Sequence, residues 1–206
     1  MKTTSHGFTI TELIVAMAMS LFVSLAGWGF YSSQLKSLST QSNELDAAES
    51  ARSALAFMAY EIRLAGLDPL DTAFATAGLT GVSQARSSRM DIQFDRDSSG
   101  DVDDDLADPA AESVSYTYDA ANQRIVRTVD GDEQALIRNV PLGGLSFVYY
   151  DKNGNLLPFV GSPLALSSAD RDRIAVVAIN VQVQKKDSTI TLSARSTLRN
   201  RVLERL

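Results

Sequence analysis

The chain has 206 residues, of which 45% are hydrophobic and 21% are charged, as in ordinary globular proteins. This length holds one domain and an accessory element, so neither wholesale disorder nor a polytopic membrane protein fits. The net charge is −6, which makes nucleic acid an unexpected partner. The absence of cysteine excludes disulfides and thiol chemistry, and His6, the single histidine, excludes His-dependent triads elsewhere in the chain.

Residues 13–30 form the longest uncharged apolar run, LIVAMAMSLFVSLAGWGF. Its length suits a transmembrane helix, which needs about 20 apolar residues. Three interpretations remain open. Lys2 with the small residues Ser24 and Ala26 fits a cleaved secretory signal, and a plain bitopic anchor fits as well. Glu12, an acid at the edge of the apolar run, favours a third interpretation, because neither a signal nor a plain anchor needs it.

The segment GFTITELIV, residues 7–15, resembles the class III signal motif of type IV prepilins, and with it the pilin and pseudopilin family. The resemblance implies that residues 1–7 are a leader and that a prepilin peptidase cuts after Gly7. Phe8 would then become the N-methylated terminus. Glu12 would be the assembly residue, because its carboxylate can meet the new amine within one subunit or on a neighbour.

A helix is predicted to continue beyond the apolar run. Apolar residues recur at spacings of three, four and seven and predict one stripe along a helix: Leu35, Leu38, Leu45, Ala48, Leu55, Met58 and Ile62. Gly66, followed by Pro69, is the expected end of the helix. Residues 8–31 are therefore predicted as the transmembrane and assembly half, and residues 32–66 as the amphipathic half.

The rest of the chain is predicted to form strands. Residues 67–89 are interpreted as a connecting loop with at most a short strand, and residues 90–206 as an antiparallel β-sheet domain. Apolar residues alternate in five segments, which begin near Ile92, Val114, Leu145, Val177 and Ile190. The predicted fold is α+β and pilin-like, with a long N-terminal helix, transmembrane in its first part, packed on a C-terminal antiparallel sheet.

Residues 95–105, DRDSSGDVDDD, partly match the calcium loop of EF-hands. Oxygen ligands stand at the required spacing, but position twelve is Leu106 instead of glutamate. A solvated acidic hairpin tip is the alternative interpretation. Calcium is therefore a candidate cofactor, although none is required, and its predicted ligands are Asp95, Asp97, Ser99, Asp101, Asp103 and Asp105.

Within the family, residues 54–66, ALAFMAYEIRLAG, look most like the W-type minor pilins and next like the J-type pseudopilins of type II secretion. The strand-pair region of Tyr116 and Arg127 adds to this resemblance, as do residues 147–151 and 198–201. It implies a minor pilin that takes part in priming and assembly of a type IV pilus, in a tip or initiation complex. The runner-up is a type II secretion minor pseudopilin.

The resemblance also implies the location and the partners. The chain would be a single-pass inner-membrane protein whose C-terminal domain lies outside the cytoplasm before incorporation into a pilus or pseudopilus. Its partners would be the prepilin peptidase, other minor and major pilins and inner-membrane lipid. No small-molecule substrate and no enzymatic activity are expected, because nothing pairs the carboxylates with a nucleophile.

Two further alternatives stay open. A secreted or membrane-anchored calcium-dependent adhesin module is the runner-up from another class. The arginine-rich end, with Arg195, Arg199, Arg201 and Arg205, is either a solvated face or a contact for an acidic surface on a neighbouring pilin.

Overall fold

The structure is a computed structural model that describes residues 9–68, 81–96, 98, 112–129, 131–161, 164–185 and 188–198. One long helix, α1 (Ile10–Leu64), precedes all strands. The chain divides into two compact units, Met1–Leu45 and Asp46–Leu206. The first unit is helical from Ile10 onward, and the second holds the end of α1 and every strand.

The end of α1 follows the predicted stop signal. Gly66 adopts a left-handed conformation, with φ of 77°, directly after the last helical turn. Glycine tolerates this conformation because it has no Cβ. The Gly66 N–H then donates to the carbonyl oxygen of Gln93 at 2.9 Å, so the chain leaves the helix against a strand. The prediction of Gly66 as the residue that ends the helix is confirmed.

Two antiparallel sheets make up the strand layer of the second unit. The first has the order β1-β2-β3-β4-β5, and the second has the order β6-β7-β8. A short helix, α3 (Ser168–Arg171), precedes β7. The strands are β1 (Val82–Ala85), β2 (Arg89–Gln93), β3 (Ser113–Asp119), β4 (Arg124–Val129), β5 (Asp132–Arg138), β6 (Leu145–Tyr150), β7 (Val176–Lys185) and β8 (Ser188–Thr197).

The α+β class and the long helix packed on antiparallel strands are confirmed, but the strands form two sheets instead of one. The five alternating segments correspond to β2, β3, β6, β7 and β8. Strands β4 and β5 lack a clear apolar alternation. Arg127 occupies an inward position of β4, and most of β5 is exposed. Strand β1 lies within the range interpreted as a connecting loop.

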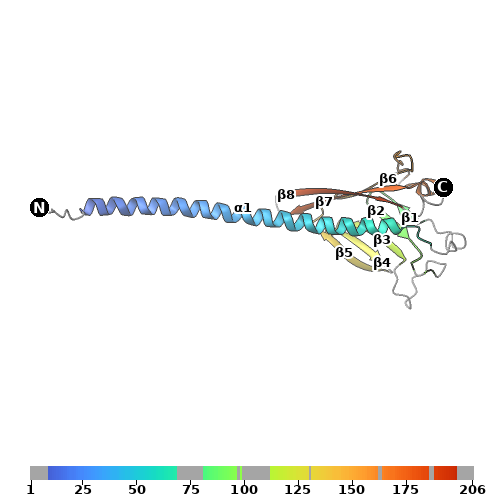
Figure 1. Ribbon diagram of the computed structural model, residues 1–206, viewed down its shortest axis with the longest axis horizontal. Coiled ribbons are helices and arrows are strands. Elements are labelled where there is room, and N and C mark those ends of the chain that lie inside the picture. Colours follow the sequence, from blue (N-terminus) through green and yellow to red (C-terminus); the bar gives the residue numbers. More distant parts are fainter. Residues whose placement is uncertain are drawn as a thin grey trace, which may run out of the picture. The chain divides into compact units, whose positions relative to one another are not determined.

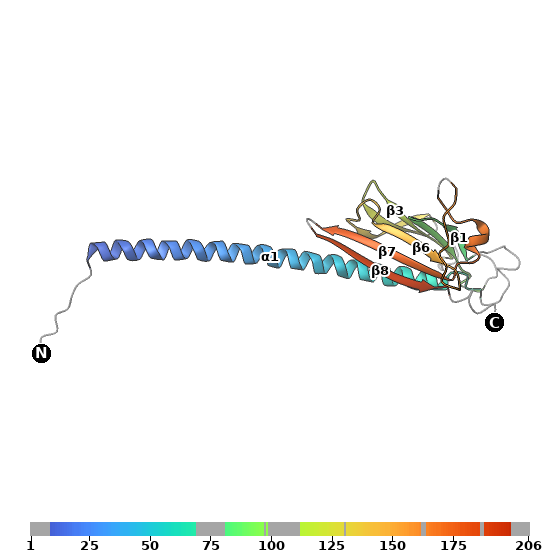
Figure 2. The ribbon, with the colours of Figure 1, turned by 90° about the horizontal axis from the view of Figure 1, so that it is seen from above.

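The core of the second unit lies where α1 meets both sheets. Figure 1 shows the end of α1 with β8 on one side and β5 on the other, and Figure 2 shows β7 and β8 beside the helix. The Ser196 hydroxyl of β8 donates to the carbonyl oxygen of Ala59 on α1 at 2.6 Å. The helix contributes a buried stripe consisting of Ala47, Ala51, Ala54, Leu55, Met58, Glu61 and Ile62.

Candidate functional site

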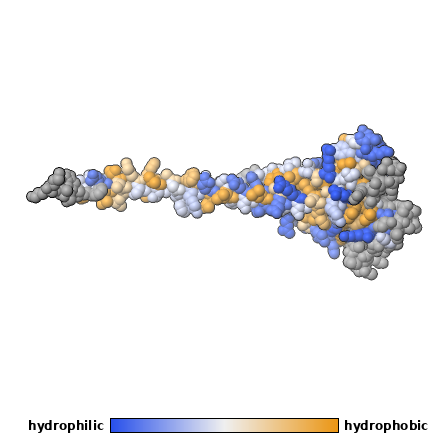
Figure 3. All heavy atoms as spheres, in the orientation of Figure 1, coloured by the Kyte–Doolittle hydropathy of each residue, from blue (hydrophilic) through white to orange (hydrophobic). Residues whose placement is uncertain are grey.

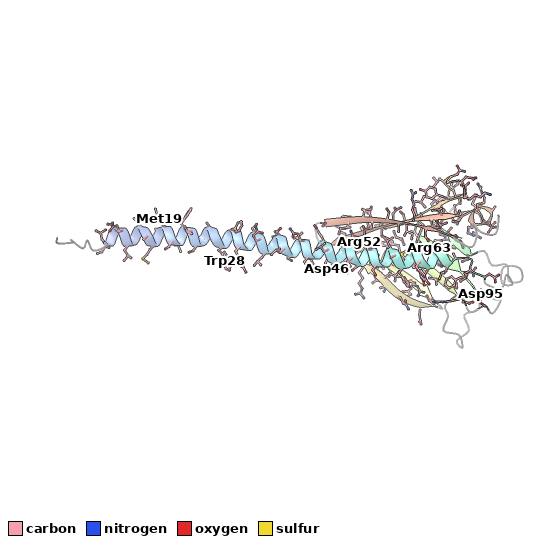
Figure 4. The ribbon with its side chains drawn as sticks, viewed as in Figure 1. Met19, Trp28, Asp46, Arg52, Arg63 and Asp95 are labelled. Atoms are coloured by element: carbon pink, nitrogen blue, oxygen red, sulfur yellow. The ribbon has the colours of Figure 1, made fainter. Side chains whose placement is uncertain are left out.

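The first unit exposes a continuous apolar helix surface. Every large apolar side chain between Ile10 and Tyr31 is more than half exposed, and Figure 3 shows the apolar colour along this part of α1. Met19 and Trp28, labelled in Figure 4, are 66% and 71% exposed. This stretch makes α1 long and apolar enough to cross a membrane. Apolar surface of this extent marks a contact with lipid or with other protein chains.

Glu12 lies in the first turn of this helix and caps its N-terminus. Its Oε2 atom accepts hydrogen bonds from the Thr9 backbone N–H at 3.0 Å and from the Thr9 hydroxyl at 2.9 Å. In return the Glu12 N–H donates to the Thr9 hydroxyl oxygen at 3.3 Å. This reciprocal arrangement is a capping box, which satisfies two of the otherwise unpaired donors at a helix start. The Thr-x-x-Glu spacing in the sequence was the signal for it.

Three serines of the exposed helix donate hydrogen bonds to carbonyl oxygens of the preceding turn. The Ser20 hydroxyl donates to the Met17 carbonyl at 2.9 Å, and the Ser24 hydroxyl donates to the Ser20 carbonyl at 2.7 Å. Ser32 makes the same kind of bond to Gly29 at 2.9 Å. These bonds to the preceding turn let polar side chains remain in an apolar setting.

The two predicted processing residues, Gly7 and Phe8, lie outside the described residues. The same holds for most predicted calcium ligands: Asp97, Ser99, Asp101, Asp103 and Asp105. No group of three or more carboxylate or imidazole side chains that could hold a metal occurs in the described part of the chain. Calcium binding therefore stays a prediction.

Asp95, the one predicted calcium ligand that the structure describes, is fully buried at the start of the acidic segment. Its Oδ1 atom accepts a hydrogen bond from the Ser98 N–H at 2.6 Å. Glu112, which is 1% exposed, follows the segment, and its Oε1 atom accepts from the Arg96 N–H at 2.7 Å. The Phe94 N–H donates to the Glu112 carbonyl at 3.0 Å. The two buried carboxylates thus hold the backbone at the start of the acidic segment, and a backbone hydrogen bond joins Phe94 to Glu112.

A second polar cluster joins α1 to the five-stranded sheet; its Tyr116–Arg127 strand pair was predicted, but the contact of Glu61 with that pair was not. Glu61 of α1 accepts from Arg127 of β4 at both carboxylate oxygens, at 2.6 Å from Nη2 and 2.8 Å from Nε. The Tyr116 hydroxyl of β3 also donates to Glu61. Tyr116 and Arg127 face one another across the β3–β4 ladder. We call Glu61, Tyr116 and Arg127 the buried triad.

Burial sets the electrostatics of the buried triad. Removal from water raises the pKa of Tyr116 above its ordinary value, and the negative charge of Glu61 raises it further. Desolvation opposes the charge of Arg127, but the hydrogen bonds and charge of Glu61 outweigh it and raise the pKa of Arg127. Arg127 also lies 5.4 Å from the ring centroid of Phe57. The buried triad is therefore a closed neutral network that fastens the helix to the sheet.

The described residues thus offer two features with different chemistry. The exposed helix with Glu12 can bury apolar surface against lipid or other helices, and it carries one acid at its start. The buried triad has no access for a substrate, since its three residues are at most 8% exposed. A search of protein-family models, curated proteins and solved structures finds no match to this chain.

Proposed function

We propose that the chain is a minor pilin that takes part in priming and assembly of a type IV pilus, within a tip or initiation complex. The observation that carries this proposal is the wholly exposed apolar helix of residues 10–31 with a single acid, Glu12, in its first turn. A helix of this kind is long enough to cross a membrane, and it carries an acidic residue that a simple membrane anchor does not need. The resemblance of residues 7–15 to the prepilin motif supports the same proposal.

The proposed mechanism begins with cleavage after Gly7 by the prepilin peptidase. Phe8 then carries a free, N-methylated amine, which stays cationic. An ammonium ion at the membrane surface and a carboxylate one helical turn away can neutralise each other, within one subunit or between neighbours. Burying the Glu12 carboxylate in an apolar helix bundle is unfavourable until it pairs with such an amine. Glu12 therefore favours the one alignment of neighbouring helices in which this pair forms.

The capping box gives Glu12 a partner before assembly. Hydrogen bonds from Thr9 hold the carboxylate at the helix start. Assembly then exchanges these bonds for a charge-assisted bond to an amine, which is the stronger interaction. The partners of this step are other minor and major pilins and inner-membrane lipid. The remaining domain would lie outside the cytoplasm, and no catalytic step or small-molecule substrate is involved.

N-terminal sequencing and intact mass of the mature protein test the processing step. We expect a chain that begins at N-methylated Phe8. A chain that keeps Met1 would contradict the proposal in favour of a plain anchor, and a start near Gly27 would favour a secreted module.

The Glu12→Ala variant tests the assembly step in a strain that lacks the natural copy. We expect insertion and cleavage to persist while piliation falls, because the carboxylate that meets the amine is gone. Glu44→Ala is the matched control, since Glu44 is an acid of the same helix beyond the apolar run. Normal piliation with Glu12→Ala, or equal loss with both variants, would contradict the mechanism.

A type II secretion minor pseudopilin remains the second assignment, since it shares the same helix chemistry. Deleting the gene separates the two: loss of surface pili with normal protein secretion favours the pilus, and the reverse favours the pseudopilus. A calcium-dependent adhesin module is the alternative of another class. The Asp95 and Glu112 carboxylates accept hydrogen bonds from Ser98 and Arg96 and so hold the start of the acidic segment that would supply its calcium ligands.

A further inference from the structure

Two aromatic residues with a polar atom lie close together on the exposed part of α1. Trp28 and Tyr31 are 71% and 56% exposed, and Figure 4 labels Trp28 on this part of the helix. They stand three positions apart and therefore share one face of the helix. Their ring centroids are 6.3 Å apart, and the ring planes are tilted by 44°. We call Trp28 and Tyr31 the aromatic pair.

The hydrogen bonding of the helix changes at the aromatic pair. Between Glu12 and Trp28, the only side chains that can donate a hydrogen bond are those of Ser20 and Ser24, and both donate to carbonyl oxygens of their own helix. The indole N–H of Trp28 and the hydroxyl of Tyr31 have no hydrogen-bond partner among the residues that the structure describes. An unpaired donor in an apolar setting is unfavourable, so the aromatic pair needs an acceptor from outside the chain.

Charged residues alone leave the depth of the helix in a membrane undefined. Residues 13–35, between Glu12 and Lys36, carry no charge. At a rise of 1.5 Å per residue they span about 35 Å, whereas the hydrocarbon layer of a bilayer is about 30 Å thick. The helix could therefore shift by roughly one turn along the membrane normal without moving a charge into hydrocarbon.

The aromatic pair removes this freedom. Along the helix, Glu12 lies about 24 Å from Trp28 and about 29 Å from Tyr31. A hydrocarbon layer of about 30 Å therefore fits between the carboxylate and the aromatic pair. The residues directly after the pair are polar, namely Ser32, Ser33 and Gln34. Tryptophan and tyrosine are enriched at such boundaries, because the ring is apolar and its polar atom reaches the headgroups.

We propose that the aromatic pair anchors α1 in the phospholipid headgroup region, at the membrane boundary opposite Glu12, and so fixes the depth of the helix before assembly. The indole N–H and the tyrosine hydroxyl donate to phosphate or ester oxygens of the lipid. A neighbouring apolar helix offers few such acceptors, because its backbone carbonyl oxygens are already hydrogen-bonded. The proposal rests on the membrane insertion that the proposed function requires, but not on pilus assembly.

Tryptophan fluorescence measures the depth directly, since Trp28 is the only tryptophan of the chain. The full chain is reconstituted at low protein-to-lipid ratio in phosphatidylcholine vesicles whose acyl chains carry bromine either near the glycerol backbone or near the methyl end. We expect quenching that is roughly twofold stronger with the shallow bromines. The control is Phe22→Trp/Trp28→Phe, which moves the fluorophore about 9 Å deeper and should reverse the order of quenching.

A thiol-labelling experiment tests whether the aromatic pair sets the depth. Because the chain has no cysteine, Ser33→Cys supplies a single thiol two residues beyond Tyr31. Adding Trp28→Leu/Tyr31→Leu should let the hydrocarbon boundary move towards Lys36, so that labelling by a water-soluble maleimide slows by roughly threefold or more. Adding Phe22→Leu/Phe30→Leu instead removes two exposed aromatic rings that have no polar atom, and it should leave the labelling rate unchanged.

Each possible failure has a distinct meaning. Stronger quenching of Trp28 by the deep bromines would overturn the proposal. Quenching that is weak with both lipids would also overturn it, because a neighbouring helix would then cover the indole. Equal labelling rates with the two double substitutions would overturn the anchoring role and leave the proposed function intact. A chain that alkaline carbonate extracts from the vesicles would overturn both the anchor and the proposed function.

Discussion

Glu61 and Arg127 form a two-point ion pair, 66 residues apart in sequence, with side chains that are 8% and 10% exposed. Both groups lie in the contact between α1 and β4. A pair this deeply buried stabilises little compared with a well-packed apolar pair, but breaking it leaves a charge in the core. Its main effect is therefore to fix which helix residue faces which strand residue.

The variant Glu61→Ala should lower the free energy of unfolding by about 3 to 5 kcal/mol, because Arg127 and Tyr116 lose their shared acceptor. The double variant Glu61→Met/Arg127→Met should lose less than Glu61→Ala alone, since no buried charge remains. Chemical denaturation followed by circular dichroism measures both. A double variant that is less stable than the single one would contradict this account.

Asp119 should contribute to acid unfolding. Hydrogen bonds from Asn122 and from Arg124 lower the pKa of Asp119 to about 2 in the folded state, against roughly 3.9 for an unfolded chain. The unfolded state thus binds the proton more tightly, so the stabilisation is present above about pH 4 and is lost as the pH falls towards 2.

Denaturation midpoints measured across this range test the role of Asp119. Asp119→Asn should flatten the loss of stability between pH 4 and pH 2, because the titrating group is gone. Asn122→Ala removes the largest contribution to the shift and should move the loss to higher pH. Profiles that coincide with that of the natural protein for both variants would contradict this assignment.

Gly81 should resist substitution because of a close backbone contact. A Cβ at Gly81 would lie 2.9 Å from the Cα atom of Gly66, and its φ is 68°. Gly81→Ala should therefore cost about 2 to 4 kcal/mol, from strain and from the displaced backbone. Gly154→Ala is the control, since its φ is 81° with nothing within 4 Å, and it should cost about 1 to 2 kcal/mol. Equal losses of thermal stability would show that the contact is unimportant.

Calcium should stabilise the second unit if the acidic segment binds it. Millimolar calcium should raise the midpoint of thermal unfolding, and EDTA should reverse the rise, because a ligand that binds only the folded state stabilises it. Asp97→Asn/Asp101→Asn should abolish the response, whereas Asp172→Asn, outside the segment, should keep it. An unchanged midpoint in the natural protein would exclude this site.

Periodicity was sufficient to predict α1 and five of the strands, β2, β3, β6, β7 and β8. Leu55, Met58 and Ile62 of the predicted stripe are buried and Gly66 ends the helix, whereas Leu35, Leu38 and Leu45 of the same stripe are exposed, because the strands cover only the end of α1. The alternation that includes Val114 and Tyr116 likewise corresponds to buried positions of a strand. These patterns succeed because they depend only on which face of an element is buried.

Long-range pairing was not predictable from such patterns. Arg127 breaks the alternation of β4, and Glu61 interrupts the apolar stripe of α1, so each residue alone argues against burial. Burial of each charge is explained only by its contact with the other. A single sequence does not show which two distant charged residues form a pair. The division into two sheets is unpredicted for the same reason. The capping box was predictable, because Thr9 and Glu12 stand at the required spacing.

The inward bonding of the helix serines has a consequence for neighbour selection. The Ser20 and Ser24 hydroxyls donate to carbonyl oxygens of their own helix. A neighbouring helix on this face therefore meets apolar side chains and no free hydroxyl donor from these two serines. Sliding and rotation past such a surface cost little. Under the proposed function, the register between neighbouring helices would therefore be set by Glu12, the acid in the first turn.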